Sequence, residues 1–62
     1  MDTKPTQTEI EALANVRRIA HEADEAGMPS LSVAAKNAER VLIDSIAQRI
    51  ALEVQAEVRR SL

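Results

Sequence analysis

Four basic side chains give this sequence its clearest indication of a binding site. They are Arg17, Arg18, Lys36 and Arg40. An arginine holds a phosphate through a planar fork of N–H donors, so such side chains gathered from two copies of the chain predict a pocket for an anionic ligand. The alternative is a solvated surface on which the cations pair with acidic neighbours at helical spacing. Those neighbours are Glu39, Asp44, Glu53 and Glu57.

Catalysis is not indicated by any residue pattern. The single histidine, His21, falls on the polar side of an expected helix, and the chain has no cysteine and no glycine-rich phosphate loop. The acidic residues Glu22, Asp24 and Glu25 lack the loop spacing of a calcium site. We therefore expect a non-enzymatic protein with no catalytic residue, no metal site and no cofactor.

A first helix is predicted over about residues 8–26, and it carries Arg17 and Arg18. Two capping boxes compete for its start, Thr8 with Glu11 and Thr6 with Glu9. Its apolar residues fall on one side at about 100° per residue. They are Leu13, Val16, Ile19, Ala20 and Ala23. Residues 1–7 are polar and include a proline, so they are predicted to form a flexible tail.

The stretch AGMPS is the only break in the helical pattern after residue 8. Gly27 is expected just after the end of the first helix, because glycine adopts positive φ without a clash. Pro29 cannot continue that helix, and Ser30 is expected to cap the next one. A turn over residues 27–30 therefore leads to a second helix of about residues 31–60. The short connection predicts an antiparallel hairpin, with residues 8–62 as one domain.

The second helix is predicted to be the longer one, at roughly 45 Å against roughly 28 Å for the first. Its apolar side rotates along its length, since steps of four residues drift around a helix. We expect the early apolar residues to pack on the first helix and the later ones to form an interface with another copy. The early residues are Leu31, Ala34, Ala35, Ala38 and Leu42, and the later ones are Ile43, Ile46, Ile50, Val54 and Val58.

Length and composition favour the same assembly. A chain of 62 residues buries only about 60% of its unfolded surface, and domains of this size usually need disulfides, a metal or oligomerisation. The chain is 45% hydrophobic but has no aromatic residue and no cysteine, and eleven of its residues are alanine. The predicted fold is all-α: a two-helix hairpin with a long second helix, assembled into a helical-bundle homo-oligomer.

The charge of the chain limits its partners. A net charge of −2 disfavours nonspecific binding to nucleic acid, and the lack of aromatic side chains removes the usual platforms for unpaired bases. No segment approaches the roughly 20 apolar residues of a membrane span, so we expect no membrane partner. The absence of cysteine agrees with a cytoplasmic location, which is the expected one.

The stretch LSVAAKNAERVLIDSI, residues 31–46, resembles the second helix of a family of small phage counter-defence hairpins, the anti-CBASS and anti-Thoeris sponge proteins. The shared features are a Leu-Ser entry, an alanine soon after it, a mid-helix glutamate and an aliphatic run. These are Leu31, Ser32, Ala34, Glu39, Val41, Leu42 and Ile43. The preceding EIEALANVRRIA is also similar. The resemblance implies a symmetric oligomer, encoded by a phage or mobile element, whose interfaces sequester cyclic nucleotide immune signals.

We therefore expect a small sequestering protein that acts by occupancy, with itself as one partner and a cyclic nucleotide as ligand. One alternative is an inhibitor or regulator that binds a host protein complex through its helix faces. Another is an RNA-binding helical dimer of the kind formed by the plasmid regulator Rop, which is a four-helix bundle of similar length.

Overall fold

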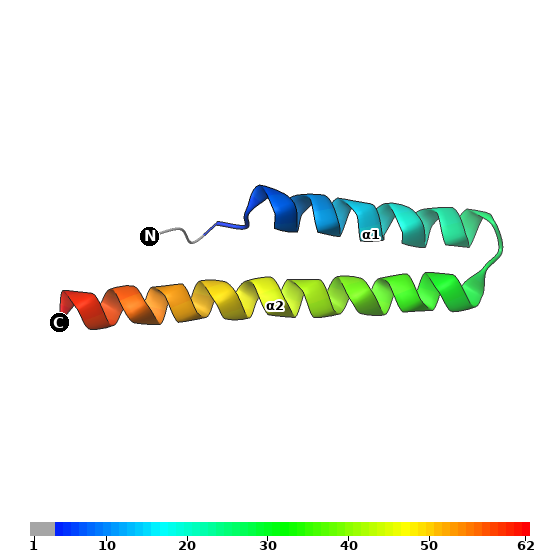
Figure 1. Cartoon of the computed structure of the whole chain (residues 1–62). Helices are drawn as coiled ribbons and strands as arrows, with labels where there is room; N and C mark the ends of the chain where they lie inside the picture. Colours follow the sequence, from blue (N-terminus) through cyan, green and yellow to red (C-terminus); the bar gives the residue numbers. More distant parts are fainter. Residues whose placement is uncertain (1–3) are drawn as a thin grey trace.

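The computed structural model describes residues 4–62, which form two helices joined by a tight turn (Figure 1). Helix α1 spans Gln7–Glu25 and helix α2 spans Pro29–Ser61. The two helices run antiparallel, and α2 continues well past the start of α1 (Figure 1). The all-helical hairpin predicted from the sequence is confirmed, with each helix boundary within two residues of its expected place.

Helix α1 begins at the second of the two candidate capping boxes. The Thr6 hydroxyl accepts a hydrogen bond from the Glu9 N–H at 3.1 Å, and the Glu9 carboxylate accepts one from the Thr6 N–H at 2.7 Å. The other candidate was wrong, because Thr8 already lies inside the helix. The predicted tail is also too long, since Thr6 and Gln7 belong to the helix start. The rest of that prediction, for residues 1–3, lies outside the described residues.

Replacing the capping residue, Thr6→Ala, is expected to destabilise the hairpin by about 1 kcal/mol, because a helix N–H loses its acceptor. The midpoint of thermal unfolding, followed by circular dichroism, measures the loss. Thr8→Ala is the matched control, because it removes the same atoms from inside the first turn and should not lower the midpoint. Equal midpoints for Thr6→Ala and wild type would contradict this account of the helix start.

The turn is a Schellman motif built on Gly27, which has φ of 68°. The Met28 N–H donates to the Ala23 carbonyl at 2.8 Å, and the Gly27 N–H donates to the Asp24 carbonyl at 3.3 Å. The predicted role of Gly27 is therefore confirmed. The predicted cap at Ser30 was wrong: α2 begins at Pro29, whose fixed φ suits the first helical position.

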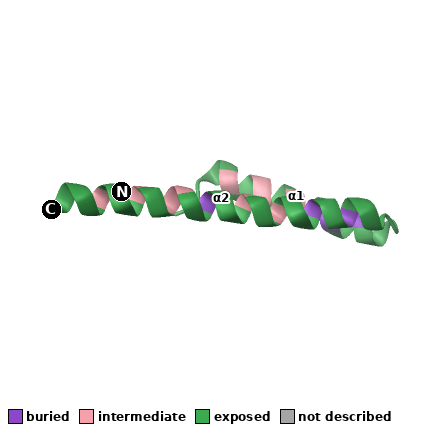
Figure 2. Ribbon diagram, turned by 90° about the horizontal axis from the view of Figure 1, so that it is seen from below, coloured by how far each residue is buried: buried purple, intermediate pink, exposed green. Residues whose placement is uncertain are grey.

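The seam between the helices follows a coiled-coil repeat with steps of three and four residues. On α1 it contains Glu9, Leu13, Val16, Ala20 and Ala23, and on α2 it contains Ser32, Ala35, Glu39, Leu42, Ile46, Arg49 and Glu53. The apolar residues that are buried in the described part of the chain are Ala20, Ala23, Ala35 and Ile46. Buried and half-buried segments recur along α2 (Figure 2). The core is therefore a single line of contacts.

The seam corrects two parts of the predicted packing. Of the early apolar residues of α2, Ala35 and Leu42 lie in the seam, whereas Leu31, Ala34 and Ala38 are exposed. Ile46 was predicted to face another copy, but it is only 7% exposed within one hairpin. The reason is that polar Ser32 occupies a seam position, which shifts the stripe that contacts α1 by one residue from the purely apolar pattern.

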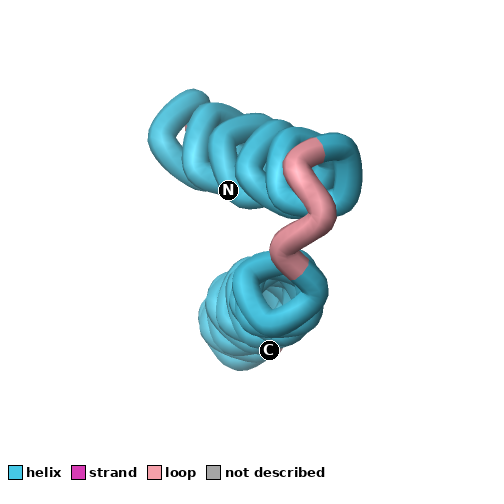
Figure 3. The backbone as a smooth tube through the Cα atoms, turned by 90° about the vertical axis from the view of Figure 1, so that its right-hand side faces the viewer, coloured by secondary structure: helices cyan, strands magenta, loops and turns pink. Residues whose placement is uncertain are grey.

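The hairpin is an elongated slab that measures 54 × 18 × 9 Å between Cα atoms along its principal axes. Viewed along its length, it consists of two helices side by side and no second layer (Figure 3). Its radius of gyration is 15.4 Å, against about 10–11 Å for a compact domain of this length. Both broad sides of the slab therefore face outward.

Candidate binding surfaces

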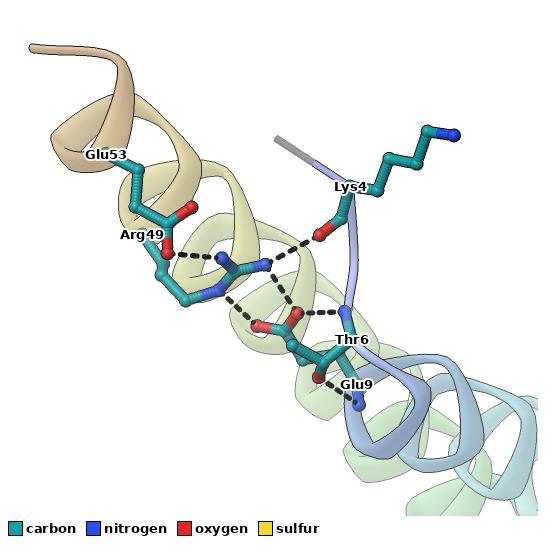
Figure 4. Close-up of polar contacts among 5 residues, drawn as sticks. All are labelled: Lys4, Thr6, Glu9, Arg49 and Glu53. Carbon is teal, nitrogen blue, oxygen red and sulfur yellow. Dashed lines mark hydrogen bonds and ion pairs between the residues drawn. The ribbon is translucent and has the colours of Figure 1, made fainter. Parts of the chain in front are cut away.

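Arg49 is the centre of a polar cluster that ties α2 to the start of α1 (Figure 4). Its Nε and Nη2 donate to the two carboxylate oxygens of Glu9 at 2.9 and 2.7 Å. Its Nη1 donates to Glu53 Oε1 at 2.9 Å, and Nη2 also donates to the Lys4 carbonyl at 3.1 Å. Since Glu9 also completes the capping box with Thr6, this one arginine sets the level along α2 at which α1 begins.

The cluster favours the charged forms of both partners. Hydrogen bonds from Arg49, and then from the Thr6 backbone, lower the pKa of Glu9 from 4.5 to about 2. Hydrogen bonding to Glu9 raises the pKa of Arg49 above its ordinary value. The two side chains are 29% and 22% exposed, so the pair is less screened by salt than a fully solvated one. The cluster is a structural clamp at the open end of the hairpin.

Acid is expected to weaken this clamp through Glu9. The pKa of Glu9 in the fold, about 2, lies below 4.5, so the unfolded chain takes up the proton first as the pH falls. The stability that Glu9 contributes is therefore complete above about pH 4.5 and is lost between about pH 4.5 and 2. Over this range the melting temperature of wild type should fall more steeply than that of Glu9→Gln, which keeps the capping geometry but does not titrate. Parallel curves would show that the clamp contributes nothing.

Three of the four predicted ligand-binding cations lie in exposed ion pairs within the chain. The pairs are Arg17 with Glu39 at 3.3 Å, Arg18 with Glu22 at 4.0 Å, and Lys36 with Asp24 at 3.5 Å. Arg40 has no ion-pair partner among residues 4–62. Exposed pairs of this kind contribute little stability, and an incoming anion has to compete with the carboxylates already present.

Asp24 is a second acidic residue of α1 that is held by side chains of α2. It accepts a hydrogen bond from the hydroxyl of Ser32, which is 3% exposed, and it pairs with Lys36. The Ser32 hydrogen bond, with a smaller contribution from Lys36, lowers the pKa of Asp24 below its usual value. The hydroxyl of Ser32 is thus satisfied inside the seam, which explains how a serine occupies a buried position.

The Asp24–Lys36 pair defines one broad side of the slab, which we call side A. Both residues directly follow a seam residue in the sequence, Ala23 and Ala35 respectively. Because each residue turns a helix by about 100°, the residues that follow seam positions share this side. They are Ile10, Ala14, Arg17, His21 and Asp24 on α1, and Val33, Lys36, Arg40, Ile43, Ala47, Ile50 and Val54 on α2. Side A therefore gathers Arg17, Lys36 and Arg40, but not Arg18.

Of the predicted apolar row, Ile43, Ile50 and Val54 lie on side A, and Val58 continues it one helical turn after Val54, whereas Ile46 lies in the seam. Ile43, Val54 and Val58 are 44%, 38% and 53% exposed, and Ile50 is half-buried beside the Arg49 clamp. The row runs from the middle of α2 into the part that extends past α1. Within one hairpin nothing covers its outer half among the described residues.

The opposite broad side, side B, is also partly apolar. Its residues directly precede seam positions, so they point the other way. Ile19, Leu31, Val41 and Leu52 are 39%, 42%, 66% and 58% exposed, and Ala34 and Ala38 lie between them. The sequence prediction assigned Leu31, Ala34 and Ala38 to the hairpin core, but they form this second exposed surface instead.

The remaining residues singled out in the sequence also lie on the surface. His21 is exposed and lies 3.4 Å from Glu25 along α1. Among residues 4–62 no three metal-binding side chains come together, and no pocket opens. Neither helix, over the residues described, is both long and apolar enough to cross a membrane.

Sequence reasoning missed the Glu9–Arg49 clamp and the Ser32–Asp24 bond. The sequence feature that could have predicted them is the spacing of three and four residues along the seam. Ser32 and Arg49 fall at coiled-coil spacing from Ala35, Leu42 and Ile46, so a repeat that tolerates polar members would have placed both against α1.

Comparison with known proteins adds no relative. No protein-family model, no curated protein and no solved structure matches this chain.

Proposed function

We propose that this chain is a non-enzymatic binding protein that works as a homo-oligomer, in which side A of α2 packs on another copy. The observation that supports it best is the exposed apolar row of Ile43, Val54 and Val58. Residues 50–61 continue roughly 18 Å beyond Arg49, which marks the start of α1. A second copy on this row would remove apolar surface from water, which is the main driving force for association.

The exposed surface of the chain gives the same argument. The accessible surface is 4789 Å², whereas a compact monomer of 6.8 kDa exposes about 4000 Å². Buried apolar residues in the described part number only four, and three of them are alanine. A hairpin with so thin a core gains much of its stability by packing against a further hairpin.

The dependence of the melting temperature on protein concentration tests the proposal. If folding is coupled to association, the midpoint rises with concentration, because mass action favours the folded oligomer. We expect a clear rise over about a hundredfold range of concentration, followed by far-UV circular dichroism. A midpoint that stays constant over that range would contradict self-association.

Side B is the surface that we propose for a partner protein. Once side A is covered by a second copy, Leu31, Val41 and Leu52 remain exposed beside small alanines, which suits an apolar helix of a partner. The chain would then inhibit or regulate a host complex by occupying a site on it.

A second candidate function is capture of an anionic ligand such as a cyclic nucleotide. The observation that favours it is the presence of Arg17, Lys36 and Arg40 on one side of the hairpin. Together with the resemblance to counter-defence sponges, this is the support for a phage or mobile-element origin. A ligand that binds only the folded state must raise the melting temperature, so a panel of cyclic dinucleotides tests it directly. No shift with any of them contradicts the sponge, and a steep salt dependence of RNA binding would favour an RNA partner instead.

A further inference from the structure

We propose that α2 pairs with α2 of a second copy in an antiparallel arrangement with a single register. At each end of the paired region, an ion pair joins Arg40 of one copy to Glu57 of the other. This inference rests on the self-association proposed above. It adds the direction of the two helices and the residues that fix their register.

Side A of α2 carries a second coiled-coil repeat. From Lys36, alternating steps of four and three residues reach Arg40, Ile43, Ala47, Ile50, Val54 and Glu57. This repeat is offset by one residue from the seam, so it is rotated by about 100° from the stripe that contacts α1. In a four-helix bundle, each helix contacts two neighbours, which lie in directions about 90° apart around its axis. Helix α2 therefore has one stripe for α1 and a separate stripe for a second copy.

The repeat and the charges at its ends together select one register for an antiparallel pair. In such a pair, the first core position of each heptad faces the second core position of the other helix, which allows registers that differ by one heptad. The one that also brings Arg40 opposite Glu57 places the two-fold axis between residues 48 and 49. Ile43 then faces Val54 of the second copy, and Ala47 faces Ile50. Each layer joins a larger side chain to a smaller one, as close packing requires. The same surface serves both copies, as in any two-fold interface.

The charges at the ends of the row favour antiparallel over parallel pairing of the two α2 helices. The antiparallel register places Arg40 opposite Glu57 of the second copy, at both ends of the row. A parallel pair in the same repeat would place Arg40 against Arg40 and Glu57 against Glu57, and like charges at an interface are unfavourable. Arg40 has no ion-pair partner among residues 4–62, and Glu57 pairs only along its own helix, with Arg60 at 2.9 Å. Arg40 can therefore take a partner across an interface, and Glu57 can exchange its exposed pair with Arg60 for that contact.

Ile10 of α1 supports the position of the axis. It follows Glu9, which pairs with Arg49, so it lies on side A close to the level of residues 48 and 49. It is 48% exposed in one hairpin. Near the axis it adds apolar surface to the middle of the proposed interface. In this arrangement Arg40 is used between copies, which leaves Arg17 and Lys36 as the cations available to a ligand.

Charge reversal tests the register with the full chain. Arg40→Glu alone and Glu57→Arg alone are each expected to shift the native mass from dimer toward monomer, because like charges then face each other. Mixing the two variants in equal amounts should restore the dimer, and so should the double variant R40E/E57R. Arg59→Glu is the matched control, since it makes the same charge change on an exposed residue outside the repeat. Circular dichroism of each variant checks that its helices remain formed.

The outcomes separate this inference from the proposed function. Single variants that stay dimeric like wild type would overturn the register and leave self-association standing. Single variants that dissociate, but do not recover in the mixture or in the double variant, would overturn the Arg40–Glu57 pair. A wild-type chain that is monomeric would overturn both.

Discussion

Ile46→Ala is expected to leave the chain largely unfolded near room temperature. Ile46 is 7% exposed and is the only buried residue of the described chain that is larger than alanine or serine. Replacing a buried isoleucine by alanine costs about 2–5 kcal/mol, because apolar contacts are lost and a cavity remains. A core of this size rarely supplies more than about 3–5 kcal/mol, so little stability would be left. Loss of the helical far-UV signal measures the effect.

Val41→Ala is the control for this prediction. Val41 lies on the same helix but is 66% exposed, so its truncation should change the free energy of unfolding by no more than about 0.5 kcal/mol. If Ile46→Ala melted at the temperature of Val41→Ala, Ile46 would not be a core residue and the seam described above would be wrong.

Val54→Asp is expected to separate the oligomer into folded monomers. Val54 is 38% exposed and faces Ile43 of the second copy in the proposed interface, where a buried unpaired carboxylate is strongly unfavourable. Ile50 occupies the same row but is half-buried beside the Arg49 clamp, so a change there would also disturb the hairpin. The native mass measures the effect, and the helical signal at high concentration checks the fold.

The same change on the other side is its control. Val41→Asp introduces an identical charge on side B, and the native mass should stay that of wild type. If Val41→Asp dissociated the oligomer and Val54→Asp did not, the interface between copies would lie on side B.

The local features of the fold could be predicted from the sequence because each depends on a few neighbouring residues. Gly27 and Pro29 end one helix and begin the next through their own backbone preferences. The capping box was predicted as a choice between two threonines. The structure selects Thr6, because its partner Glu9 is also held by Arg49 from α2.

The packing between the helices was harder to predict, because the seam includes polar residues. A search for apolar stripes passes over Ser32 and Arg49, although both face α1. It therefore assigned Ile46 to the outside and Leu31 to the inside. Ser32 and Arg49 each bond to a carboxylate of α1, Asp24 and Glu9 respectively, and such pairs across the hairpin are not visible in the sequence of one helix.

These features connect the sequence to the proposed activity. The Arg49 clamp fixes how far α1 extends along α2, and so leaves residues 50–61 uncovered by α1. The uncovered part carries Val54 and Val58, and the same side carries Arg17, Lys36 and Arg40. The length of α1 therefore decides which surface is available to a second copy.

The native mass in solution tests self-association most directly. Light scattering with refractive-index detection suits this chain, because it contains no tyrosine or tryptophan. We expect a mass of twice 6.8 kDa for the two-fold pair of hairpins. A mass of one chain at every concentration would contradict self-association and leave the apolar row of side A without the partner proposed for it.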